Sequence, residues 1–158
     1  MVSLERARRI AESLAEVLAP ACERLEVAGS IRRRVEHVKD IELVARPRGL
    51  LEDGALAPRG TGAERRMGKR YKALLTAHTK TAVDLFIVLP PAEFGAIHAI
   101  RTGPADFSRA LVTACKTRGL NCVDGRLVDA AGRTVETPTE HDFFRECGVA
   151  WIEPEARR

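Results

Sequence analysis

The apolar run from Ala82 to Val88 contains one acidic residue, Asp84, and this combination constrains the fold more than any other feature. Val83 and Leu85 flank the acid, and such a run is typical of a strand that is buried on both faces. An isolated carboxylate in that setting destabilises the fold unless a cation compensates its charge. The chain therefore needs either an arginine or a metal ion beside Asp84.

A second predicted strand, 40–45, supplies two more acidic residues. Asp40 and Glu42 stand two residues apart, so both side chains of a strand point to one face. Taken alone, this alternation is more typical of an ordinary strand with one solvated face. Together with Asp84, the pair offers the oxygen ligands that magnesium prefers. We therefore predict that Asp40, Glu42 and Asp84 are both the catalytic residues and the metal ligands.

Gly29 and Ser30 precede these acids and follow another short predicted strand, 24–28. If a short helix starts at Ser30, its amides favour an anion. Gly29 lets a phosphate approach the backbone, and Ser30 offers a hydroxyl. A Gly-Ser pair alone is a weak signal, and the three arginines within 31–34 can form a solvated face. Because an acidic pair and a buried third acid follow, the Gly-Ser pair and the arginines together predict a site for the phosphates of a nucleotide.

The rest of the chain predicts a mixture of helices and strands. Ser3 precedes a helical apolar pattern that Pro20 ends, and Tyr71 opens a strand before the buried run. The Gly- and Pro-rich stretch 47–62 is predicted as a loop. Later helices are expected over 92–100, with Pro91 in the first turn, then over 105–118, and after the cap Thr139, with short strands between the last two.

These elements predict an α/β (α+β) protein. A mixed sheet with helices on one side carries the acids, and a smaller α+β lobe follows. The expected domains are 1–102 and 103–158. No run is long enough for a transmembrane span, and the first residues do not form a signal peptide. Four widely spaced cysteines without a C-x-x-C motif indicate reduced core residues of a cytoplasmic protein, with neither a zinc site nor a disulfide.

The formal net charge is +4, which suits a partner rich in phosphate. Basic residues gather between Arg59 and Lys72, where we predict nucleic-acid contacts. An exposed, solvated loop is an equally good interpretation of this stretch. The residues predicted to contact nucleic acid are Arg65, Arg66, Lys69, Arg70 and Lys72.

The acids and the Gly-Ser pair together resemble the palm motif of family X DNA polymerases. Gly29-Ser30-Ile31-Arg32-Arg33 leads to Asp40-Ile41-Glu42 at that family's spacing, and Val83-Asp84-Leu85 resembles its third-carboxylate strand. The resemblance continues through Thr102-Gly103 and Thr137-Pro138-Thr139-Glu140 to Trp151-Ile152-Glu153-Pro154. It covers residues 4–154, as a minimal nucleotidyltransferase palm followed by a thumb-like carboxy-terminal lobe.

The resemblance implies a nucleotidyltransferase that adds a nucleotide to a DNA 3′-hydroxyl by a two-metal mechanism. It implies two Mg²⁺ ions, for which Mn²⁺ can substitute, a nucleoside triphosphate, and primer-template or gapped DNA. The expected setting is gap filling or end repair by a monomer in the cytoplasm, of phage or bacterial origin, without a membrane. The residues that it implies for nucleotide binding are Gly29, Ser30, Arg33, Lys39, Thr102, Gly103 and Ser108.

Several positions depart from the family pattern. Glu42 stands where these polymerases usually have aspartate, and Ile100-Arg101 replaces an aromatic pair beside the nucleotide sugar. The palm begins almost at Met1, which leaves no room for the amino-terminal lyase lobe of larger members. Two alternatives stay open: a nucleotidyltransferase that acts on RNA, protein or a small molecule, and a non-catalytic nucleic-acid-binding module.

Overall fold

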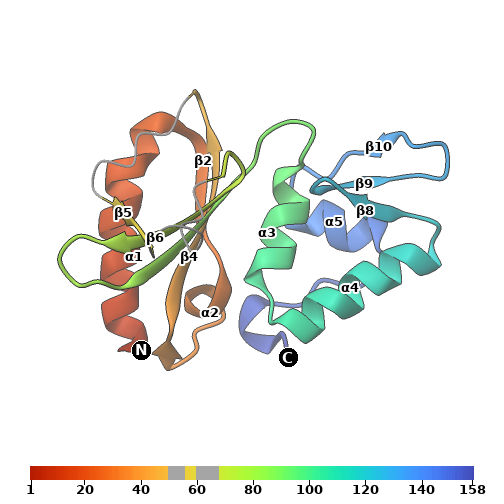
Figure 1. The fold of residues 1–158 in the computed structure, drawn as a ribbon. Helices are drawn as coiled ribbons and strands as arrows, with labels where there is room; N and C mark the ends of the chain where they lie inside the picture. The colour runs from red at the N-terminus through yellow and green to blue at the C-terminus, as the bar shows by residue number, and fades with distance from the viewer. Residues whose placement is uncertain (50–55, 60–67) are drawn as a thin grey trace.

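The structure is a computed structural model that describes residues 1–49, 56–59 and 68–158, and it forms two lobes (Figure 1). A five-stranded sheet of order β2-β4-β7-β6-β5 forms the first lobe. β4 and β7 run parallel, and the other neighbours are antiparallel, so the predicted mixed sheet is confirmed. The strands are β2 (Cys22–Val27), β4 (Asp40–Pro47), β5 (Leu56–Pro58), β6 (Tyr71–Thr76) and β7 (Ala82–Ile87).

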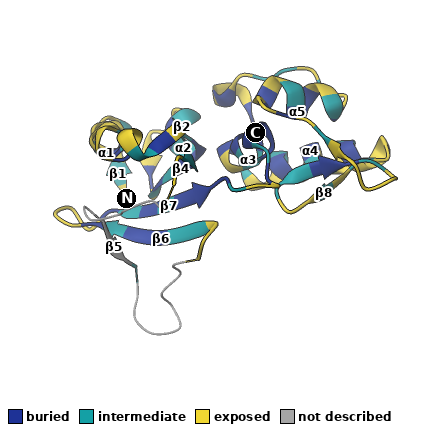
Figure 2. Cartoon of the chain, turned by 90° about the horizontal axis from the view of Figure 1, so that it is seen from above, coloured by how far each residue is buried: buried dark blue, intermediate teal, exposed yellow. Residues whose placement is uncertain are grey.

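Helix α1 (Leu4–Leu18) covers one face of this sheet (Figure 2). Ser3 caps it as predicted, because its Oγ accepts a hydrogen bond from the Arg6 amide at 3.4 Å. A 3₁₀ turn (Ala19–Ala21) that contains Pro20 follows, and β1 (Val2–Ser3) pairs with β3 (His37–Val38) beside the helix. The core between α1 and the sheet includes Ala7, Ala11, Leu14, Leu18, Ile41, Leu43, Val83 and Leu85.

Alternate residues of the central strands point away from α1. Since the side chains of a strand alternate between its faces, Glu42 and Val44 lie opposite the α1-facing side chains, as do Asp84 and Phe86. Val44 and Phe86 pack against Phe94 of helix α3 (Phe94–Thr102). The acids therefore share the face of the sheet that also meets the second lobe.

Three helices and a small antiparallel sheet form the second lobe. Thr139 caps α5 (Glu140–Glu146) as predicted, and it forms a capping box with Asp142. The core of the lobe gathers around two fully buried rings, Phe143 and Phe144. Its elements after α3 are α4 (Ala105–Thr117), β8 (Asn121–Val123), β9 (Arg126–Val128), β10 (Thr134–Val135), α5 (Glu140–Glu146) and a 3₁₀ turn (Pro154–Ala156).

Some elements differ from the sequence expectations. α3 begins at Phe94 with Glu93 as its N-cap, so Pro91 lies in the preceding turn and not in the helix. The predicted loop over 47–62 contains β5, which pairs with β6, whereas 50–55 and 60–62 lie outside the described residues. α3 packs with both lobes, and the predicted boundary after Thr102 stays a prediction. None of the helices in the described ranges is long and apolar enough to span a membrane.

A disulfide joins Cys115 on α4 to Cys147 after α5, which corrects the expectation that all four cysteines are reduced. Both cysteines are buried, and 32 residues separate them in the sequence. Sequence spacing alone could not indicate the pair, because the two cysteines meet only when the hydrophobic core of the second lobe forms. Cys22 and Cys122 are free.

One buried carboxylate, Glu140, connects the two lobes. Its Oε2 accepts a hydrogen bond from Arg32 of α2 (Gly29–Arg32), and its Oε1 accepts one from Arg157 at 3.1 Å. Arg32 also donates to Thr102 Oγ1 at 2.7 Å. Burial alone would raise the pKa of Glu140, but the hydrogen bond from Arg32 and the charges of His98, Arg32 and Arg157 lower it overall. The two lobes thus meet at a buried carboxylate whose charge is balanced by two arginines.

We expect Glu140→Ala to lower the free energy of unfolding by about 3–5 kcal/mol, because two arginines lose a buried counter-ion. Urea unfolding measures this change. Glu155→Ala is the matched control, since it removes the exposed partner of Arg34 across the same lobe boundary. That control should lower the free energy of unfolding by about 1 kcal/mol or less. Equal losses in the two variants would contradict the role given to Glu140.

Candidate active site

The parallel pairing of β4 and β7 brings the predicted acids together on one face. Glu42 lies directly opposite Asp84 in the register, and Asp40 stands two residues earlier on the same face of β4. All three side chains are half-buried. The arrangement expected from the sequence is therefore present, and the chemical role of the three acids stays a prediction.

The pKa of Glu42 is raised well above its ordinary value in this site. Burial raises its pKa, the charges of Asp40 and Asp84 raise it further, and Arg33 and Arg101 offset only part of this, so that the pKa is about 7. The carboxylate of Glu42 lies against Gly29, where a Cβ would stand 1.5 Å from Glu42 Oε2. Gly29, whose φ is +60°, thus makes room for a carboxylate in this structure.

Asp84 has the cation that the sequence required, and that cation is an arginine. Asp84 Oδ1 accepts a hydrogen bond from Arg59 at 2.9 Å and another from the Tyr71 hydroxyl at 2.7 Å. Sequence reasoning missed both partners, because Arg59 appeared only as one residue of a basic stretch. Its approach to Asp84 depends on the position of β5 at the edge of the sheet, which no sequence pattern indicated.

The three acids fit magnesium in their chemistry. They offer carboxylate oxygens on one face, and a cation between them would relieve the repulsion that raises the pKa of Glu42. Within residues 1–49, 56–59 and 68–158, however, no three His, Cys, Asp or Glu side chains stand close enough to hold a metal ion. Ion binding would therefore require Asp40 and Glu42 to turn toward Asp84, which Arg59 and Tyr71 hold in place.

A cavity of about 390 Å³ opens beside Glu42, between the sheet and the start of α4. Arg33 contributes to it and donates a hydrogen bond to the carbonyl oxygen of Thr102. Ser30 Oγ is buried and has no hydrogen-bond partner among the described residues. The residues that line this cavity include Arg33, Glu42, Arg101, Gly103, Ser108 and Arg109.

Other predicted nucleotide contacts are engaged with the protein itself. Thr102 is fully buried, and its hydroxyl accepts from Arg32. Ser108 Oγ donates to the carbonyl oxygen of Ile100 at 2.7 Å, so in this structure the hydroxyl fastens the end of α3 to α4. Lys39 is exposed immediately before β4. Roles for these residues in nucleotide binding remain predictions.

Arg101, one of the residues that departs from the family pattern, packs over an aromatic ring of the sheet. Its guanidinium lies 4.2 Å from the centroid of the Phe86 ring, and Tyr71 stacks on the same ring at 5.3 Å between centroids. This contact holds a positive charge near Glu42, where it opposes the rise in the pKa of that acid.

The basic stretch is described only in part. Lys69 and Arg70 are exposed, Lys72 is half-buried, and Arg65 and Arg66 lie outside the described residues.

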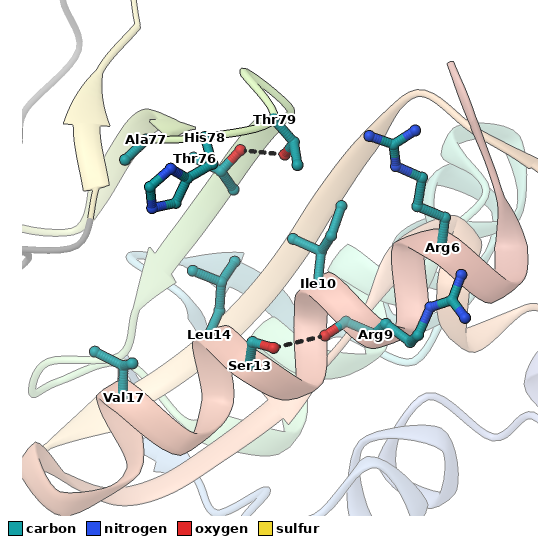
Figure 3. A pocket seen from close by; sticks show the side chains of 10 residues that line it. All are labelled: Arg6, Arg9, Ile10, Ser13, Leu14, Val17, Thr76, Ala77, His78 and Thr79. Atoms are coloured by element: carbon teal, nitrogen blue, oxygen red, sulfur yellow. Dashed lines mark hydrogen bonds between the residues drawn. The ribbon is translucent and has the colours of Figure 1, made fainter.

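A larger cavity of about 820 Å³ lies elsewhere, between α1 and the turn 76–79 (Figure 3). Because α1 covers the face opposite the acids, this larger cavity is separate from the candidate active site.

Residues 98–158 match the family described as DNA polymerase beta thumb. DNA polymerase lambda of Rattus norvegicus is 33% identical over an alignment of 82 residues, and the match covers 45% of this chain. The match spans 14% of the length of that relative. The resemblance to family X DNA polymerases that the sequence indicated is thereby confirmed.

The raised pKa of Glu42 predicts a pH-dependent stability in buffer without divalent cations. The unfolded chain ionises Glu42 near its ordinary value of 4.5, whereas the folded chain does so at about 7. Stability is therefore lost as the pH rises through this window. We expect Glu42→Gln to gain stability over wild type between about pH 4 and pH 8, by on the order of 2 kcal/mol in urea unfolding. If the free energies of unfolding of Glu42→Gln and wild type differ by the same amount at both pH values, the prediction is wrong.

Proposed function

We propose, from the likeness to the thumb of family X DNA polymerases together with the three acids, that this chain transfers a nucleotide from a nucleoside triphosphate to a DNA 3′-hydroxyl. The observation that carries the proposal is the register of β4 and β7, which sets Glu42 opposite Asp84 with Asp40 on the same face. Gap filling and end repair are the reactions that this small palm and thumb suit best.

Two magnesium ions, or manganese in their place, would supply the Lewis acidity that activates the hydroxyl and neutralises the leaving pyrophosphate. Asp40, Glu42 and Asp84 would bind them. Glu42, whose pKa is about 7, is partly protonated at neutral pH and would release its proton as the positive charge arrives. The acids therefore couple ion binding to proton release.

Triphosphate binding would fall to Ser30 and Arg33. The Ser30 hydroxyl is buried and has no hydrogen-bond partner among the described residues, so it can donate to a phosphate oxygen without giving up a described contact. Arg33 already lies in the cavity beside Glu42. Exposed Lys69 and Arg70 would contact the DNA backbone, and such contacts weaken as the salt concentration rises.

One observation favours a second candidate, a nucleic-acid-binding module without catalysis. Asp84 is already compensated by Arg59, so its burial alone does not require a metal ion. Primer extension separates the two candidates. Wild-type chain that binds gapped DNA but adds no nucleotide with Mg²⁺ or Mn²⁺ would favour the module.

We expect Asp84→Asn to lower kcat for extension of a gapped DNA primer by about 100-fold or more, because the substitution removes one carboxylate ligand. Asp129→Asn is the matched control, since Asp129 is a half-buried acid that is paired with Arg133 after β9 and does not line the cavity beside Glu42. The control should keep wild-type kcat. Full activity of Asp84→Asn would rule out the proposed transfer mechanism.

Sugar selection should be weak. Ile100 and Arg101 stand where the family has an aromatic pair, and crowding of a hydroxyl without a hydrogen bond at stake discriminates by roughly 100-fold or less. We therefore expect kcat/KM for a deoxyribonucleotide to exceed that for its ribonucleotide by no more than this on one gapped primer. A preference on the order of 10,000-fold would contradict the prediction.

A further inference from the structure

Asp84 is held by two donors that come from outside the parallel pair β4–β7. Arg59 follows β5 at the edge of the sheet, and Tyr71 opens β6. Both hydrogen bonds end on Oδ1 of the carboxylate, at 2.9 Å and 2.7 Å. Neither donor uses the second oxygen, Oδ2, so the contacts set the orientation of the carboxylate and leave that oxygen to other ligands.

The two donors are themselves fixed in place. The Arg59 amide donates to the carbonyl of Ala73 at 2.8 Å, and its guanidinium also donates to the carbonyl of Val83 at 3.2 Å. Tyr71 pairs with Phe86 across the strands and stacks on its ring. The exposed fractions of the side chains are 34% for Arg59 and 15% for Asp84, so this pair is only partly solvated.

We propose that Arg59 and Tyr71 are positioning residues that orient Asp84 for a divalent cation. That the orientation serves a divalent cation rests on the proposed function. Neutralisation of a buried acid would need only the arginine, whereas the Tyr71 hydroxyl carries no charge and can only fix the direction of the carboxylate. Two donors on one oxygen fix the rotation of the carboxylate as well as its charge.

Charge and direction can be separated by two conservative substitutions. Tyr71→Phe keeps the ring that stacks on Phe86 and removes only the hydroxyl. Arg59→Lys keeps the positive charge and removes the geometry of the guanidinium. Arg46→Lys on β4 is the matched control, because it makes the same exchange on a strand of the same sheet away from the described contacts of Asp84.

Binding of Mn²⁺ alone to the full chain, followed by electron paramagnetic resonance, measures the effect without nucleotide or DNA. We expect Tyr71→Phe and Arg59→Lys each to raise the Mn²⁺ dissociation constant roughly three- to tenfold, the effect of one net hydrogen bond. Arg46→Lys should bind as wild type does, and Asp84→Asn should lose the site. Thermal unfolding of each variant establishes that the chains compared are folded, and either substitution alone can carry the test if the other fails to fold.

Unchanged or tighter Mn²⁺ binding in a folded Tyr71→Phe or Arg59→Lys chain would overturn the inference, because the donors would then be neutral to the ion or compete with it. A wild-type chain that binds no Mn²⁺ through Asp84 would also overturn it. If the expected losses occur but wild type extends no primer, the positioning role stands and the proposed transfer reaction fails.

Discussion

The parallel pairing of β4 with β7 is the constraint on which the candidate active site depends. Side chains of a strand alternate, so a slip of one residue would turn Glu42 or Asp84 into the apolar core under α1. Buried Leu43 and Leu85 oppose such a slip, because they would leave that core at the same time. Hydrophobic packing on one face thereby fixes the position of the acids on the other.

Two adjacent arginines, Arg32 and Arg33, have different surroundings at the boundary between the lobes. Arg32 turns to the second lobe, where it meets Glu140 and Thr102, whereas Arg33 lines the cavity beside Glu42. Arg33 also donates to the carbonyl oxygen of Thr102, so both arginines contact the same residue of α3. The contact between the lobes and the wall of the cavity therefore share Thr102.

Local patterns in the sequence predicted a large part of this architecture. The helix capped by Ser3, the cap at Thr139 and the face shared by Asp40 and Glu42 all follow from spacing within short segments. The contacts of Arg59 with Asp84 could not be predicted, because they depend on the pairing of strands far apart in the chain. The disulfide and the buried Glu140 were missed for the same reason.

The close approach of Glu42 to Gly29 has a consequence for how this chain can vary. Any side chain at position 29 would occupy the space that the carboxylate of Glu42 now fills, and the positive φ adds a second penalty. Replacement of Gly29 is therefore conditional on residue 42. A shorter acid at position 42 would relieve the collision but not the backbone requirement. The two positions form a coupled pair, in which a change at one sets the substitutions that the other can accept.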